Sequence, residues 1–152
     1  MSPRIVLIED WPPPDTVTRA IVCRTPSKLV IAYGTGDDKM AVLVFPHPAT
    51  LKVGGPNDEA LTGHSLYRYG LKPYSIHRVD NSPWLDELER QNAVHPRHSE
   101  ARFRASKVHY IFALKEETIE CMAWQPPDSS VVVDVFESRD LALQHIRESI
   151  DA

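Results

Sequence analysis

The apolar residues of the first third of the chain predict short β-strands. Residues 5–8 form a brief apolar run that ends at a proline-rich turn, and residues 16–24 are rich in β-branched side chains. Residues 29–32 and 41–45 are apolar at every position, which is typical of strands covered on both faces. We therefore expect a β-meander whose later strands are buried on both sides.

The second half of the chain predicts further strands, one pair of which forms a hairpin with Glu116 and Glu117 at its tip. These strands are expected at residues 75–79, 107–115, 118–124 and 131–136. Runs of strands with helices appended to them are typical of an α+β fold. We expect a mostly antiparallel sheet of about six strands, packed by a central helix and a C-terminal helix.

The two helices are predicted from their capping residues. Ser82 followed by Pro83 marks the start of the central helix, which ends before Pro96. Ser138 precedes the C-terminal helix over residues 139–150, which carries an apolar stripe at helical spacing. Each helix is therefore expected to pack one face against the sheet.

The predicted hairpin decides which side chains share a sheet face. A two-residue tip places His109 opposite Trp124 and Cys121 opposite Phe112, so His109 and Cys121 point to different faces. Cys121 falls on the more apolar face and is expected to be a buried, unreactive thiol. Glu120 shares the face of His109 but lies diagonal to it, so we expect no direct contact between them.

A long connection without a strand pattern covers residues 46–74. Compact domains rarely keep more than about 12–15 residues without regular structure unless the segment is functional or disordered. This segment holds several leucines and tyrosines, which makes it too apolar for disorder. We expect an ordered loop, with a helical turn near residues 57–61, that roofs a cleft on the sheet.

Side chains suited to ligand binding are concentrated in the middle of the chain. Six of the seven histidines and four of the five tyrosines lie between His47 and Tyr110, mostly on predicted loops, where binding residues often occur. Residues 64–110 carry eight lysines and arginines against five acids, whereas the remainder carries nine against sixteen. In a chain of net charge −4, this pattern favours a small anionic ligand and disfavours nucleic acid.

The bulk properties predict an ordinary globular chain. Its 152 residues are expected to form one domain, residues 1–152. It has neither the roughly 20 apolar residues of a membrane span nor a signal peptide, and its two cysteines are too few for a disulfide framework. We therefore expect a cytoplasmic protein without membrane contact. The oligomeric state stays open, and a homodimer is one state that the sequence allows.

The segment His95-Pro96-Arg97-His98 is the part of the sequence that comes closest to a metal-binding motif. Two imidazoles three residues apart can share one ion, with His64, His109 or a nearby carboxylate as further ligands. Pro96 nevertheless breaks the helix that would align the rings, and no zinc-enzyme signature is present. We assign no metal ligand and no cofactor, and expect His95 and Arg97 to line a ligand pocket.

The long loop offers polar and aromatic groups to the same pocket. Asn57 and Asp58 follow two glycines and can supply polar contacts, although a purely structural turn explains them equally well. Tyr67 and Arg68 can stack a planar ligand while the guanidinium pairs with its acid group, or they can simply pack the loop onto the sheet.

The stretch from Gly54 to Tyr110 resembles a family of small bacterial proteins to which no activity is assigned. The resemblance rests on the segments GGPNDEALTGH, LYRYGL, NSPW, NAVHPRH and HYIF. It covers about the middle third of the chain. Because the family has no assigned activity, the resemblance implies no catalytic residue.

The leading hypothesis is a site for a polar small molecule, preferably an anion, in a cleft lined by histidine, tyrosine and arginine. The ligand-binding candidates are Asn57, Asp58, Tyr67, Arg68, His95 and Arg97. If a reaction occurs, we expect proton transfer by histidine and carboxylate groups, with His64, His98 and His109 as catalytic candidates. The alternatives are a protein-interaction surface rich in tyrosine, arginine and tryptophan, and a histidine-ligated metalloenzyme.

Overall fold

The computed structural model describes residues 1–47, 49–125 and 130–152. The strands in these parts are β1 (Arg4–Leu7), β2 (Ile21–Arg24), β3 (Leu29–Gly36), β4 (Lys39–Phe45), β5 (Ala49–Lys52), β6 (Ser75–Asp80), β7 (Lys107–Ala113), β8 (Thr118–Trp124) and β9 (Val132–Phe136). The α-helices are α1 (Pro83–Asn92), α2 (Glu100–Ala105) and α3 (Arg139–Asp151), and two short 3₁₀ helices are η1 (Asp58–Gly63) and η2 (Tyr67–Tyr69). None of the described helices is long and apolar enough to span a membrane.

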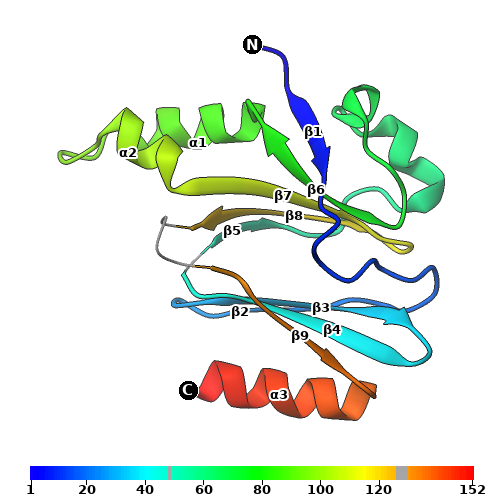
Figure 1. Ribbon diagram of the computed structural model, residues 1–152. Coiled ribbons are helices and arrows are strands. Elements are labelled where there is room, and N and C mark those ends of the chain that lie inside the picture. Colours follow the sequence, from blue (N-terminus) through cyan, green and yellow to red (C-terminus); the bar gives the residue numbers. More distant parts are fainter. Residues whose placement is uncertain (48, 126–129) are drawn as a thin grey trace.

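The strands form two antiparallel sheets stacked face to face (Figure 1). One sheet has the order β1-β6-β7-β8-β5 and the other has the order β2-β3-β4-β9. The α+β class is thus confirmed, but the prediction of about six strands in one sheet is wrong, because the described residues form nine strands in two sheets. β1 leaves the predicted meander to pair with β6, and β5 arises within the predicted loop and pairs with β8.

The second sheet is covered on both faces. Leu29, Ile31 and Leu43 face the first sheet, where they pack among Ile76, Phe112 and Ile119 in the core between the sheets. The alternate residues of β3 and β4 point the other way and pack against α3, as Figure 1 shows. This arrangement confirms the prediction that β3 and β4, with their unbroken apolar runs, are buried on both sides.

The outer face of the first sheet carries the loop and the central helices (Figure 1). Leu61, Leu66 and Leu71 anchor the 3₁₀ region on Ile111 and Ala113 of β7. α1 begins at Ser82, whose side chain accepts a hydrogen bond from the Leu85 amide, so the predicted cap is confirmed. The η1–η2 region and α1 therefore lie on one face of the sheet.

The hairpin of β7 and β8 has the predicted faces but a different register. Its turn is centred on Lys115 and Glu116, one residue earlier than predicted, with the Leu114 amide bonded to the Glu117 carbonyl, so His109 lies opposite Met122. The predicted pairing is wrong by two positions, and a shift by two keeps every side chain on its face. Cys121 is fully buried in the core between the sheets, and burial raises the pKa of its thiol.

Candidate functional site

A buried carboxylate lies between two imidazoles on the outer face of the first sheet. Glu120 of β8 accepts a hydrogen bond at Oε1 from His109 Nε2, 2.8 Å away, and another at Oε2 from His64 Nε2, 2.9 Å away. His109 comes from β7, and His64 directly follows η1. The expectation of no contact between Glu120 and His109 is wrong, because a long side chain can bridge a diagonal position.

These contacts keep the Glu120 carboxylate ionised. Its side chain is only 14% exposed. Burial alone raises a carboxyl pKa, but the hydrogen bonds from His109 and His64 outweigh it and lower the pKa of Glu120 to about 2. Each imidazole must therefore present an N–H to the carboxylate, which has no proton of its own to donate.

The second nitrogen of each imidazole is also occupied. His64 Nδ1 accepts a hydrogen bond from the Leu66 amide at 3.0 Å, so the proton of this ring is on Nε2. His109 Nδ1 lies 2.7 Å from Ser82 Oγ, which also accepts the Leu85 amide. The His109 nitrogen that donates to Glu120 is Nε2, and the Ser82 hydroxyl is the hydrogen-bond partner of Nδ1. Neither ring presents a free lone pair to solvent.

Ser82, His109 and Glu120 form a serine–histidine–carboxylate chain, but the serine is not placed for attack. Ser82 is 2% exposed and caps α1 with the oxygen that a nucleophile would need. This hydrogen-bonded chain of side chains lies within the fold and joins the start of α1 to both strands of the hairpin. It orients Glu120 and His109, and its serine is not accessible to a substrate.

A cavity of about 210 Å³ opens beside this cluster. Its walls come from β5, β7, β8, the end of η1 and the start of α1: Lys52, His64, Ser65, Leu66, Pro83, Trp84, Glu87, His109 and Glu120. Trp84 is buried and meets the His109 ring edge-on at 5.1 Å. The cavity therefore combines one aromatic wall with charged and polar groups.

Lys52 supplies the positive charge of the cavity. It lies directly opposite Glu120 in the β5–β8 register, yet its ammonium sits over the Trp84 ring, 4.3 Å from the centroid. Within the described residues it forms no ion pair, since the oxygens of Glu120 are taken by the two histidines. The cavity thus holds a cation and a carboxylate that do not neutralise each other.

The predicted residues around His98 lie elsewhere. His98 Nε2 donates to Glu89 Oε1 at 2.8 Å, and its Nδ1 contacts the Asn92 amide at 2.8 Å, near the end of α1. His95 and Arg97 are exposed on the following loop. α1 has 10 residues, so its two ends are about 15 Å apart. The expected convergence of all candidates on one hollow is therefore wrong, because α1 separates them.

Four predicted ligand-binding residues of the long loop also lie outside the cavity. The Asn57 side chain caps η1, and Asp58 accepts a hydrogen bond from Tyr74 Oη at 2.5 Å, which lowers the pKa of the Asp58 carboxyl. Tyr67 is 39% exposed, and Arg68 bonds the hydroxyl of Tyr69 on the surface. The loop instead contributes His64 and its two following residues to the cavity.

Sequence reasoning missed Lys52, Trp84 and Glu87 and dismissed Glu120 as a partner of His109. Lys52 belongs to a four-residue strand inside the predicted loop, and only its pairing with β8 reveals its neighbours. Among the described residues, no group of three or more histidine, cysteine, aspartate or glutamate side chains is placed to hold a metal ion.

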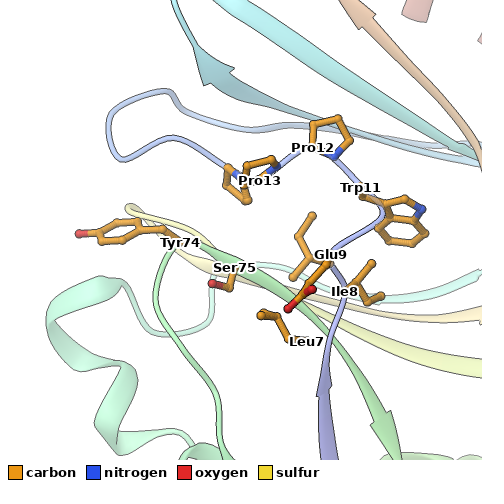
Figure 2. Close-up of a pocket in the computed structure, with 10 residues that line it drawn as sticks. Leu7, Ile8, Glu9, Trp11, Pro12, Pro13, Tyr74 and Ser75 are labelled. Carbon is orange, nitrogen blue, oxygen red and sulfur yellow. The ribbon is translucent and has the colours of Figure 1, made fainter.

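A second cavity, of about 260 Å³, lies where the N-terminal segment closes one end of the sandwich (Figure 2). Figure 2 shows Trp11 and Tyr74 at its opposite ends, with Pro12 and Pro13 along one side. Trp11 is part of the core, 5.0 Å from the Tyr110 ring. Of the described residues that line this cavity, Glu9 alone is charged. It lacks the opposed charges of the Glu120 cavity, which is therefore the stronger candidate.

Replacing Ser82 by alanine should lower the free energy of unfolding by about 2–3 kcal/mol, because it removes a helix cap and the partner of a buried imidazole nitrogen. Ser138→Ala is a matched control, since Ser138 caps α3 through the Leu141 amide and touches no histidine. Its loss should be about 1 kcal/mol. Urea unfolding of both variants measures the difference, and equal losses would contradict the Ser82–His109 bond.

No protein-family model matches the chain, and neither the curated proteins nor the solved structures contain a match. The resemblance of residues 54–110 to a bacterial family therefore stays a prediction.

Proposed function

We propose that the Glu120 cavity binds a small molecule that carries one acidic group and one amine or hydroxyl donor. The acidic group pairs with Lys52, and the donor group bonds the Glu120 carboxylate. Amino acids and hydroxy acids are the simplest compounds of this class. The cavity, at about 210 Å³, is smaller than the sites of about 300–1,000 Å³ that hold drug-sized ligands, which suits compounds of this size.

The observation that carries the proposal is the separation of Lys52 from Glu120. The two residues are cross-strand partners, but the lysine ammonium rests on Trp84 and the carboxylate is held by His64 and His109. A carboxylate has about four acceptor positions, and the two imidazoles use two of them. The remaining positions accept donors from a ligand without disturbing the histidines.

The occupied imidazole nitrogens favour binding over catalysis by histidine. A general base needs a lone pair within reach of the proton that it removes. His64 and His109 each use one nitrogen as a donor to Glu120, and the other nitrogen of each ring is hydrogen-bonded within the protein. Their role in the proposed site is to hold Glu120 ionised and in one orientation.

The test of the proposal is the binding of amino acids and hydroxy acids. Binding is measured from the melting temperature and from the indole resonance of Trp84. A ligand at 100 times its dissociation constant stabilises the protein by about 2.7 kcal/mol. Compounds that lack either the acid or the donor group should bind more weakly by roughly tenfold, since each loses one charge-assisted hydrogen bond.

Lys52→Met should abolish discrimination between each acid and its amide. Lys39→Met is the control, because Lys39 lies at the start of β4 in the other sheet and does not line the cavity. The proposal is wrong if Lys52→Met and Lys39→Met bind the acids equally well. It is also wrong if none of the panel shifts either the melting temperature or the Trp84 indole signal.

A further inference from the structure

The geometry points to a second ligand site at the other end of α1, a groove that binds a small aromatic phosphate such as a nucleoside monophosphate. The groove has two connected parts of about 300 and 370 Å³, which share Asn92, Phe103 and Lys107. It has no lining residue in common with the Glu120 cavity. The inference therefore stands independently of the proposed function.

Aromatic rings form one part of this groove. Lys107 and Trp124 lie opposite each other at the ends of β7 and β8, and Phe103 comes from the neighbouring helix α2. The Lys107 ammonium lies 4.7 Å from the Phe103 ring centroid and 5.4 Å from that of Trp124. The Trp124 ring also meets the His47 imidazole, with 4.7 Å between the ring centroids. Trp124 is nevertheless 40% exposed, and this exposed part of the indole is open to a flat ligand.

Positive charges line the same part of the groove as Trp124. Arg97, Arg102 and Lys107 line the groove, and within the described residues none of the three forms an ion pair. No described carboxylate lines it either. The nearby acids are engaged elsewhere, Glu89 with His98 at 2.8 Å and Glu100 with Arg104 at 3.3 Å. In a chain of net charge −4, three unpaired cations in one groove favour an anionic ligand.

The combination of aromatic rings and positive charges in this groove indicates the class of ligand. Two guanidinium groups match the oxygens of a phosphate better than an ammonium does, because each offers a planar fork of donors. An exposed indole stacks on a nucleobase with about 1–3 kcal/mol per base. A groove with three cations on an acidic protein suits one nucleotide and lacks the extended basic surface that a polynucleotide requires.

The experiment follows the three tryptophan indole N–H signals while adenosine monophosphate, adenosine or inorganic phosphate is added. Trp124→Phe assigns one signal by its loss. Adenosine monophosphate should move the Trp124 signal and leave those of Trp11 and Trp84 in place. Adenosine and phosphate should each bind more weakly by roughly tenfold, because each keeps only one half of the interaction.

Arg102→Gln should weaken binding of adenosine monophosphate by roughly tenfold, whereas Arg147→Gln on α3 should leave it unchanged. Equal effects of the two variants would overturn the proposal, as would movement of the Trp84 or Trp11 signal in place of Trp124. Phosphate that binds as tightly as the nucleotide would show that no ring stacks. A short oligonucleotide that binds far more tightly would identify a nucleic-acid surface instead, which also overturns the proposal.

Discussion

Glu120→Gln should lower the free energy of unfolding at neutral pH by about 2–4 kcal/mol. The carboxylate accepts from two imidazole N–H groups, whereas a glutamine amide has one oxygen and would turn its own N–H toward one of the rings. His109 is 2% exposed, so a donor left without a partner there is costly. The control is Glu116→Gln at the exposed hairpin turn, which removes the same charge and should change stability by less than about 0.5 kcal/mol.

The same substitution should change how stability depends on pH. The pKa of Glu120 is about 2 in the folded protein, against an ordinary value of 4.5. A lowered folded-state pKa gives stability that is fully present above the ordinary value and is lost as the pH falls toward 2. The difference corresponds to about 3 kcal/mol.

Urea unfolding between pH 5 and pH 2 checks this dependence. The parent protein and Glu116→Gln should both lose stability steeply through that range, because unfolded Glu120 takes up a proton before folded Glu120 does. Glu120→Gln should lose about 3 kcal/mol less over the same range. Parallel curves for the two glutamine variants would show that Glu120 is not held by the histidines.

Phe112→Ala should cost about 3–5 kcal/mol, as expected for a large aromatic side chain removed from a packed core. Phe112 is fully buried between the two sheets, with its ring centroid 6.1 Å from that of Tyr33 and 6.4 Å from that of Trp11. The substitution would leave a cavity that neither sheet can close. Phe103→Ala, on the partly exposed groove of α2, is a matched control and should cost much less. Denaturant unfolding of both variants gives the comparison, and similar losses would contradict a core between stacked sheets.

Local signals in the sequence predicted much of the fold. Ser82 and Ser138 cap their helices as expected, since a serine side chain and the amide it accepts lie three residues apart. The unbroken apolar runs of β3 and β4 predicted burial on both faces. This signal is also local, because an apolar side chain at every position of a strand indicates that both of its faces are covered. The elements that were missed depend on distant parts of the chain.

β5 shows why the site was only partly predictable. Its four residues carry no strand pattern of their own, and they become a strand by pairing with β8 about 70 residues further along the chain. Lys52 could therefore not be placed beside Glu120 from the sequence. His64 and His109 were recognised as candidates from their residue type, but the position of the β7–β8 turn, and hence the register of the hairpin, could not be read from the local sequence. The separation of His98 from them follows from the length of α1, which the sequence predicted without revealing what lies at each end.

The most direct test of the Glu120 site is the tautomeric state of its histidines, read from the ¹⁵N shifts of the imidazole nitrogens at neutral pH. The structure requires a proton on Nε2 of both His64 and His109, and it requires His64 to be neutral because its Nδ1 accepts the Leu66 amide. His77 is an internal contrast, because its Nδ1 donates to the Ile111 carbonyl and its Nε2 accepts the Lys72 amide. Two Nε2–H rings at positions 64 and 109 and an Nδ1–H ring at position 77 are expected. A ring without a proton on Nε2 at His64 or His109, or a doubly protonated His64, would contradict the account.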